Sequence, residues 1–209
     1  MEAISILDEI TGDLGLVLWR SARNVLLWAE TPAASRASLF AGSAGRARQD
    51  ELAHVEVDPE LRAPLSVFAD LLSRPAAADL LRLVNACRRV SAWAEQRGAM
   101  GTALEFMQAA SLAAPDTASL AFNVGRIARR MADYDRAESW YTRAVVQARE
   151  TRDWRSYTSS LVGMGNLHKQ RGNYPAAKRA YQRSLHVAER RHLRDLIAAG
   201  YHSLFSLDR

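Results

Sequence analysis

The chain has 209 residues, of which 48% are hydrophobic and 24% are charged, with a formal net charge of +5 at pH 7. This length and composition suffice for one or two structural units with a buried core. The single Cys87 excludes a disulfide within the chain. The most apolar stretch, residues 14–29, is interrupted by Arg20 and Arg23 and is too short and too charged to span a bilayer. The first four residues lack the basic start of a secretory signal, so we expect a soluble, cytoplasmic protein with no membrane association.

Residues 1–75 are expected to form a helical region with a linker. Residues 6–30 predict one helix, because apolar side chains cover more than half of its circumference. Residues 31–60 are rich in Ala, Ser, Gly and Arg and are interpreted as a linker with room for one helix. Short helices are expected over residues 65–72 and again from residue 76. Prolines crowd this stretch and disfavour a further hairpin centred on Ala69.

Residues 76–209 contain an internal repeat. Segments 98–103, 132–137 and 172–177 share one layout, in which a small residue is followed by an apolar or aromatic residue and then by an alanine. The final alanines lie 34 and 40 residues apart, and self-similarity at such periods indicates an array of one supersecondary unit. Apolar residues recur at helical spacing on both sides of each segment. Each unit is therefore expected to be a helical hairpin, and the fold all-α.

Small residues recur at the turns and inside the predicted hairpins. The turns open with Gly98, Ala132 and Gly172, where a left-handed backbone suits glycine and strains alanine. In the second and third units a glycine of the first helix is matched by a tyrosine of the second: Gly125 with Tyr141, and Gly165 with Tyr181. We expect the glycines to let the helices approach closely and the tyrosines to fill the space beside them. Because one hairpin cannot bury its apolar face alone, neighbouring hairpins must stack.

These units resemble the tetratricopeptide repeat, whose signature places Leu-Gly and an aromatic residue in the first helix, and alanine, an aromatic residue, alanine and proline in the second. The second unit, residues 118–151, offers Ala121, Val124, Gly125, Ala128, Ala137, Tyr141 and Ala144. The third unit, residues 158–191, offers Leu161, Met164, Gly165, His168, Ala177, Tyr181 and Ser184. The first unit, residues 84–117, has Val90-Ser91 in place of Leu-Gly but carries Ala103, Met107, Ala110 and Pro115. The resemblance implies an α-α superhelix of tandem hairpins.

Two departures from this signature carry expectations of their own. About six additional residues separate the second and third units around residues 150–157, where Asp153 is a suitable N-cap. Longer helices are expected there rather than a loop. A terminal helix over residues 193–207 repeats the start of the third unit, with Phe205 in place of Gly165. Either this helix caps the array and Phe205 closes its end, or the chain is the front part of a longer repeat protein.

The resemblance also implies a function, a non-catalytic scaffold whose concave groove, lined by the first helix of each unit, binds a peptide or helical segment of a partner protein. The implied partner-binding residues are Asn85, Arg88, Arg89, Phe122, Asn123, Arg126, Arg129, Arg130, Asn166 and Lys169, with Val162 beside them. Residues 84–209 hold 20 Lys or Arg against 11 Asp or Glu, which favours an acidic partner. Arginine is also a good helix former on a solvated face, so ordinary surface charge stays the alternative interpretation.

No motif indicates an enzyme, a cofactor or a metal. The five histidines lack metal-ligand spacing, and the chain has neither a glycine-rich phosphate loop nor a nucleophile elbow. Contact with RNA or DNA is the alternative function, because basic residues interleaved with aromatic ones are typical of single-strand binding. The best patch for it combines Trp154 and Tyr157 with Arg152 and Arg155.

Overall fold

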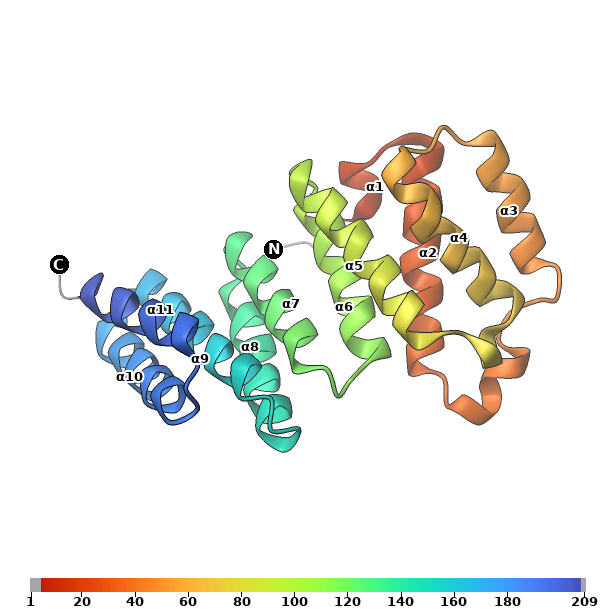
Figure 1. Cartoon of the computed structure of the whole chain (residues 1–209). Coiled ribbons are helices and arrows are strands. Elements are labelled where there is room, and N and C mark those ends of the chain that lie inside the picture. Colours follow the sequence, from red (N-terminus) through yellow and green to blue (C-terminus); the bar gives the residue numbers. More distant parts are fainter. Residues whose placement is uncertain (1–4, 208–209) are drawn as a thin grey trace. The chain divides into compact units, whose positions relative to one another are not determined.

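The computed structural model describes residues 5–207, and every regular element within them is a helix. Helices α1 to α11 and two short 3-10 helices, η1 and η2, follow one another along the chain (Figure 1). Consecutive helices pack against each other within residues 80–113 and within residues 118–205, so the prediction of an all-α fold of tandem hairpins is confirmed. Contacts divide the chain into two compact units, Met1–Pro115 and Asp116–Arg209.

The first unit contains the predicted hairpin of residues 84–117 together with the helices that precede it. Its elements are α1 (Ile6–Glu9), α2 (Gly12–Glu30), η1 (Ala33–Ser38), α3 (Ala44–His54), α4 (Pro59–Ser73), η2 (Pro75–Ala77), α5 (Leu80–Gln96) and α6 (Met100–Ala113). The hairpin consists of α5 and α6, and α6 also packs on α2 while α5 packs on α4. Phe68 stacks on Phe106 in this shared core, with ring centroids 5.7 Å apart. A start of the repeats at residue 76 stays a prediction, because a shared core does not mark where the first repeat begins.

The single helix predicted over residues 6–30 is wrong, since α1 and α2 are separated at Ile10 and Thr11. Ile10 is extended and Gly12 has a φ of +72°, a left-handed conformation that glycine adopts readily. The Ile10 carbonyl then lies close over α2, because a Cβ on Gly15 would come within 1.8 Å of its oxygen. The apolar periodicity hides the break because both helices bury residues in the core.

Residues 31–60, which were interpreted as a linker with room for one helix, contain more helical structure than expected. They hold η1 and α3, and α3 packs against α4. The helix expected over residues 65–72 begins earlier, at Pro59, where the missing N–H of proline falls in the first turn and costs no helical hydrogen bond. Helices α3 and α4 therefore pair in this stretch despite its prolines. Ala69 of α4 is fully buried.

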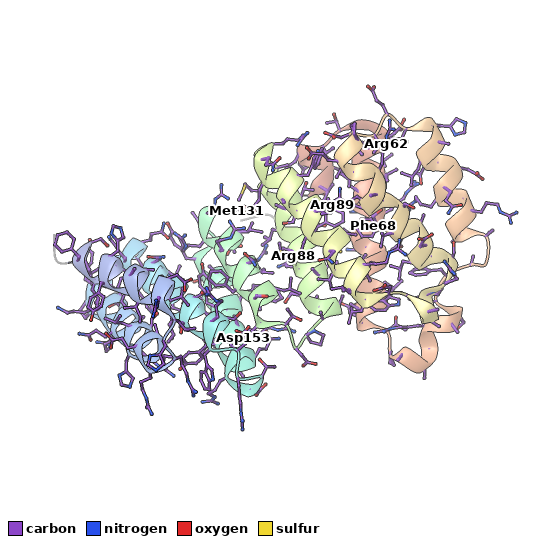
Figure 2. The ribbon with its side chains drawn as sticks, in the orientation of Figure 1. Arg62, Phe68, Arg88, Arg89, Met131 and Asp153 are labelled. Carbon is purple, nitrogen blue, oxygen red and sulfur yellow. The ribbon has the colours of Figure 1, made fainter. Side chains whose placement is uncertain are left out.

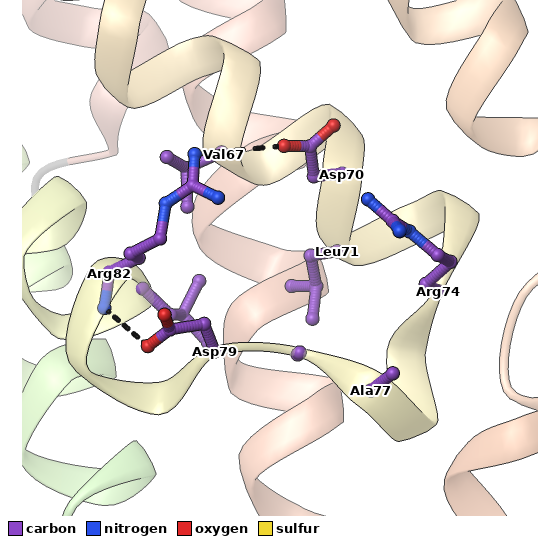
Figure 3. A pocket seen from close by; sticks show the side chains of 9 residues that line it. Val67, Asp70, Leu71, Arg74, Ala77, Asp79 and Arg82 are labelled. Atoms are coloured by element: carbon purple, nitrogen blue, oxygen red, sulfur yellow. Dashed lines mark hydrogen bonds and ion pairs between the residues drawn. The ribbon is translucent and has the colours of Figure 1, made fainter.

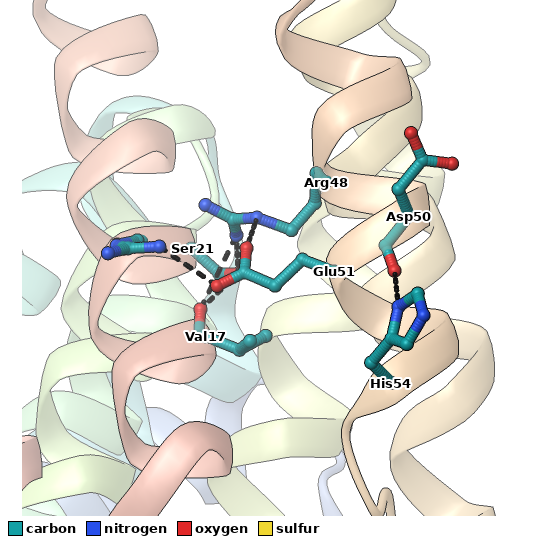
Figure 4. A network of polar contacts seen from close by, with 7 residues as sticks. Val17, Ser21, Arg48, Asp50, Glu51 and His54 are labelled. Atoms are coloured by element: carbon teal, nitrogen blue, oxygen red, sulfur yellow. Dashed lines mark hydrogen bonds and ion pairs between the residues drawn. The ribbon is translucent and has the colours of Figure 1, made fainter.

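A buried arginine of α3, Arg48, connects this helix to α2 through hydrogen bonds and ion pairs (Figure 4). Arg48 is only 7% exposed, and its Nε lies 2.9 Å from Glu51 Oε2. Its guanidinium also donates to Ser21 Oγ at 3.0 Å, while Arg20 pairs with the other oxygen of Glu51 at 2.9 Å. Burial lowers the pKa of Arg48 and the Glu51 carboxylate opposes that shift. Glu51 lies only three residues from Arg48, but Ser21 lies 27 residues away and Arg20 lies 31 residues from Glu51, so the contacts with α2 could not be predicted from a local sequence pattern.

Helix α6 receives its N-terminal cap from the far end of the first unit. Its own N-cap residue is Ala99, which has no side chain to accept a hydrogen bond. The Glu9 carboxylate accepts instead from the backbone N–H groups of Gly101 and Thr102, both at 2.7 Å, and from the Thr102 hydroxyl at 2.8 Å. A carboxylate at this end also interacts favourably with the helix dipole. Glu9 therefore couples α1 to α6.

Replacing Glu9 with alanine should lower the free energy of unfolding of the first unit by about 1–3 kcal/mol, because the charge-assisted hydrogen bonds to the part-buried N–H groups in the first turn of α6 are lost. Urea denaturation followed by circular dichroism measures the change. Glu56→Ala removes an exposed carboxylate for which the structure shows no hydrogen bond and should shift stability by less than about 0.5 kcal/mol. Equal effects of the two substitutions would contradict the capping role.

The second unit alternates the first and second helices of successive hairpins. It contains α7 (Ala118–Arg130), α8 (Tyr134–Glu150), α9 (Trp154–Gln170), α10 (Tyr174–Arg190) and α11 (Arg194–Phe205). The α7–α8 and α9–α10 pairs are the predicted second and third units, although α9 starts four residues before the predicted residue 158. The additional residues around 150–157 lengthen the helices as expected and leave only a short turn, where Asp153 accepts from the Ser156 N–H at 3.0 Å. Phe205 of α11 is 59% exposed, so its ring does not close the end of the stack.

Each turn passes through one residue in the left-handed conformation. The φ angles of Gly98, Ala132 and Gly172 are +77°, +60° and +74°, as the sequence predicted. Arg152 and His192 occupy the corresponding places in the turns that join successive hairpins. In the α7–α8 turn the N–H groups of residues 132 and 133 return to carbonyls of the last turn of α7, which closes the helix end.

Ala132→Gly should therefore stabilise the second unit. Removing the left-handed strain outweighs the extra freedom of glycine in the unfolded chain, and we expect a gain of up to about 1 kcal/mol in the free energy of unfolding. Gly172→Ala, the reverse change at the equivalent turn, should cost a similar amount. Urea midpoints of both variants test the pair, and a loss of stability in Ala132→Gly would contradict this account of the turn.

The predicted pairing of glycines with tyrosines is confirmed in both hairpins. A Cβ on Gly165 would lie 2.3 Å from Tyr181, and one on Gly125 would lie 2.7 Å from Tyr141. Tyr141 also fits against the next hairpin, because a Cβ on Gly163 would lie 2.6 Å from its ring. Both tyrosines are almost fully buried. Tyr141 thus joins α7, α8 and α9, which fixes the spacing of the two first helices.

Candidate binding surface

The predicted groove residues of the second unit lie on two neighbouring helices. Helix α7 packs against α9, and α9 packs against α11, so the first helices of successive hairpins form one layer. We name the surface that these residues form the α7–α9 face; it comprises Phe122, Asn123, Arg126, Arg129, Arg130, Val162, Asn166 and Lys169. Most of these side chains are half-buried, and Arg130 is exposed.

Arg129 connects the two helices of this face. Its guanidinium donates to Gln170 Oε1 at 3.1 Å, while its Nε is buried without a hydrogen-bond partner in the part of the chain that the structure describes. Burial raises the pKa of the Tyr141 hydroxyl, and a hydrogen bond and the positive charge of Arg129 act against that shift. Burial likewise raises the pKa of Tyr181, again opposed by the charge of Arg129. Arg129 therefore lies near the hydroxyl ends of both tyrosines.

The two asparagines of the face differ in whether their side-chain NH₂ groups already donate a hydrogen bond. The Asn123 amide donates to the Ser119 carbonyl at 2.8 Å, and its oxygen accepts from Arg126 Nε at 3.3 Å. The Asn166 oxygen accepts from the Tyr181 hydroxyl at 2.7 Å, and its NH₂ group has no acceptor among residues 5–207. Asn166 is thus oriented by Tyr181 with its amide donors available.

Two more residues of the face have structural contacts. Lys169 Nζ donates to the Ser206 carbonyl at 3.0 Å and lies 3.2 Å from its hydroxyl, which places a positive charge at the C-terminal end of α11, where the helix dipole favours it. The Phe122 ring lies 5.9 Å from the Tyr141 ring at an angle of 39°. Lys169 therefore holds α11, and Phe122 forms an aromatic surface supported by a buried tyrosine.

The remaining predicted residues, Asn85, Arg88 and Arg89, are exposed on α5 of the first unit; Figure 2 labels the two arginines. They belong to the first compact unit and are not part of the α7–α9 face. Arg89 has a structural contact, a hydrogen bond of 3.2 Å from its guanidinium to the Glu60 carbonyl. Pro64, four residues after Glu60, has no N–H to satisfy that carbonyl. The Arg89 guanidinium therefore donates the hydrogen bond that a backbone N–H at position 64 would otherwise donate.

Sequence reasoning missed the polar partners that order this face. Gln170 and Ser206 were not singled out, and both tyrosines were assigned only to the core, although their hydroxyl groups reach Arg129 and Asn166. One signal was available. Both hairpins carry tyrosine rather than phenylalanine at the position that faces the glycine, and a buried tyrosine hydroxyl usually has a hydrogen-bond partner.

The patch proposed for nucleic acid has little free aromatic surface. Tyr157 is only 4% exposed, and the Arg183 guanidinium lies 5.5 Å from its ring. Trp154 packs edge-on against Tyr157 and carries the Arg191 guanidinium 4.2 Å from its ring centroid. Base stacking needs an open ring face, so Tyr157 cannot serve as the platform that the sequence suggested.

A hollow of about 120 Å³ in the first unit offers no evident chemistry (Figure 3). Asp79 at its edge caps α5 by accepting from the Arg82 N–H at 3.0 Å, and the Arg82 guanidinium lies 4.0 Å from Asp70. Within residues 5–207 no three His, Cys, Asp or Glu side chains gather as a metal site. Over the same residues, no helix combines the length and apolar character needed to cross a membrane.

Comparison with known proteins agrees with the geometry of the second unit. The model of the tetratricopeptide repeat family matches residues 116–190, which hold α7 to α10. A search of curated proteins finds no match. Repeats of this family generally mediate protein–protein interactions and typically act as non-catalytic scaffolds. The α5–α6 hairpin lies outside the match. The match and the packing of its hairpins support the assignment of residues 116–190 to the tetratricopeptide repeat family.

Proposed function

We propose that the chain is a non-catalytic scaffold that binds an acidic, extended segment of a partner protein on the α7–α9 face. The observation that carries this proposal is the clustering of Arg126, Arg129 and Arg130 on α7 beside the oriented amide of Asn166 on α9. The residues that make up the α7–α9 face include four positively charged side chains, Arg126, Arg129, Arg130 and Lys169, and no acidic one. A cytoplasmic location stays a prediction.

The chemistry of these groups suits a peptide. Arginine can hold a carboxylate through two parallel hydrogen bonds, and the Asn166 NH₂ group can donate to a backbone carbonyl of an extended segment. Phe122 offers an apolar contact between them. Exposed ion pairs contribute only about 0.2–1 kcal/mol each, and ordering the peptide costs free energy. A complex of roughly micromolar affinity that weakens with salt is therefore expected.

The double substitution Arg126→Glu and Arg130→Glu should abolish binding because it reverses the charge on α7 that faces the peptide. Peptides of about 12 residues can be selected for binding to the full chain from a displayed random library, and their affinity measured by calorimetry. A loss of at least about tenfold, or 1.4 kcal/mol, is expected with helix content unchanged by circular dichroism.

The matched control is Arg149→Glu with Arg190→Glu, which makes the same change in net charge at exposed positions of α8 and α10. These positions lie outside the α7–α9 face, so the affinity should change by less than about twofold, apart from long-range effects that salt screens. Equal losses in the two double variants would show that net charge, rather than the α7–α9 face, drives binding.

A further inference from the structure

A hollow of the second unit lies between α8, α9 and α10, with a volume of about 420 Å³. Its lining residues are Thr142, Val145, Val146, Leu161, Met164, Arg179, Ala180 and Arg183. Met164 and Asn166 are two residues apart on α9, which turns their side chains about 200° away from each other. The hollow therefore lies on the opposite side of α9 from the α7–α9 face, and we name it the α8–α10 hollow.

The floor of the α8–α10 hollow is apolar and rests on the core. Leu161 belongs to a buried cluster with Tyr157, and Val145 and Met164 pack against that cluster. Val146 stands at the edge and is 42% exposed, which is unusual for an aliphatic side chain on the otherwise polar surface of α8. A volume in this range is typical of sites that receive a side chain or small ligand. The hollow is thus suited to an aliphatic side chain from another molecule.

The rim of the hollow is positively charged. Arg179 and Arg183 lie one turn apart on α10, about 6 Å along the helix axis. Arg183 is held in place by a hydrogen bond to the Tyr157 hydroxyl and by contact with its ring. Arg179 forms no ion pair within residues 5–207. On α8, Glu138 lies one turn before the hollow, but Arg171 engages its carboxylate at 2.5 Å.

We propose that the α8–α10 hollow is a second protein-binding site, whose occupant is an acidic amphipathic helix that inserts one leucine-sized side chain. Two carboxylates one turn apart on that helix match the spacing of Arg179 and Arg183, and the inserted side chain covers Val146 and the apolar floor. The charge is complementary and the arginines can bind carboxylates bidentately. A nucleic acid would satisfy the arginines but has no aliphatic group for the floor. This site is independent of the α7–α9 face.

The probe for this proposal is a labelled helical peptide of about 16 residues, long enough to form a helix, with one central leucine between glutamates one turn apart. A second peptide carries glutamine in place of the leucine. Fluorescence anisotropy with the full chain gives the affinities, and methyl-labelled methionine spectra locate the peptide. Met164 lines the hollow, whereas Met131, which follows Arg130 at the end of α7 (Figure 2), does not line it and serves as the reference signal.

The leucine peptide should shift the Met164 methyl signal and leave that of Met131 in place, and the glutamine peptide should bind at least about tenfold more weakly, because it cannot bury an aliphatic group. Ala180→Leu fills the hollow and Arg179→Glu reverses the rim charge, and each should weaken the leucine peptide by about tenfold. Arg190→Glu, the same charge change farther along α10, should alter affinity less than about twofold.

Arg179 is exposed, so its variant keeps the test decisive even if Ala180→Leu disturbs folding. A Met164 signal that does not move at saturating peptide would overturn the proposal. So would an affinity for Arg179→Glu that equals that of the unaltered chain, or a shift confined to Met131, which would place the peptide outside the α8–α10 hollow.

Discussion

Truncation of Tyr141 to alanine is expected to lower the free energy of unfolding of the second unit by about 3–5 kcal/mol, the range found for large aromatic side chains removed from cores. Tyr141 is 1% exposed and lies against Gly125 of its own hairpin and Gly163 of the next. Its removal opens a cavity between two glycines, which have no side chains to fill it. The change is measured by urea denaturation monitored by circular dichroism.

Tyr141→Phe is the control for this prediction. It keeps the ring and removes the hydroxyl that Arg129 contacts, so a loss of about 1 kcal/mol is expected from one hydrogen bond. If Tyr141→Ala cost no more than Tyr141→Phe, the ring would not be the element that joins the hairpins, and the account of the stack would be wrong.

The second large effect is expected at Gly165. Even the single methyl group of alanine would lie 2.3 Å from Tyr181 Cε1 and 2.5 Å from Cδ1, far inside van der Waals contact. Gly165→Ala should therefore destabilise the second unit by about 1–3 kcal/mol through overpacking, although alanine favours the helix by about 1 kcal/mol in the absence of strain. Thermal denaturation with calorimetry measures the net change.

A double-mutant cycle tests the cause of that loss. Tyr181→Leu vacates the space that the new methyl group needs, so Gly165→Ala should cost less in this background, with a coupling of at least about 0.5 kcal/mol. Gly42→Ala serves as the neutral control, because a Cβ on Gly42 meets nothing within 4 Å. A cost for Gly165→Ala that does not depend on residue 181 would exclude the proposed clash.

The features that the sequence predicted well are those that repeat. Gly125 and Gly165, the tyrosines facing them and the left-handed residues of the turns recur at matching places, and repetition reveals a shared structural cause from one sequence. The same logic predicted the hairpins, whereas the N-cap at Asp153 was predicted from its residue type. The helix ends were predicted less accurately where the apolar periodicity gives no signal that a helix stops. At Ile10 a short break leaves the apolar pattern intact on both sides.

The features that the sequence could not predict depend on contacts between distant residues. The Glu9 carboxylate reaches the N-terminus of α6 across more than 90 positions, and neither residue alone suggests the other. Arg89 and Lys169 were predicted to face a partner, yet both donate to backbone carbonyls at irregular places, Glu60 before a proline and Ser206 at a helix end. Such roles follow from which carbonyls lack donors, and that becomes visible only in the folded chain.

The candidate binding surface was therefore predicted in outline and revised in detail. The sequence placed Arg126, Arg129 and Asn166 on the first helices of neighbouring hairpins, and the packing of α7 on α9 brings them into one face. The structure adds that Tyr181 orients Asn166 and that the buried Nε of Arg129 has no hydrogen-bond partner among the residues that the structure describes. The amide donors of Asn166 favour a ligand with acceptor oxygens, which is the property that an acidic peptide supplies.

The most direct test of the central claim is to locate a selected acidic peptide on the full chain by nuclear Overhauser contacts. Bound to the α7–α9 face, the peptide should show contacts to the Phe122 ring and the Val162 methyl groups and should shift the side-chain amide signals of Asn166. Contacts only to residues of α8 and α10, with Phe122 and Asn166 unchanged at saturation, would contradict the claim.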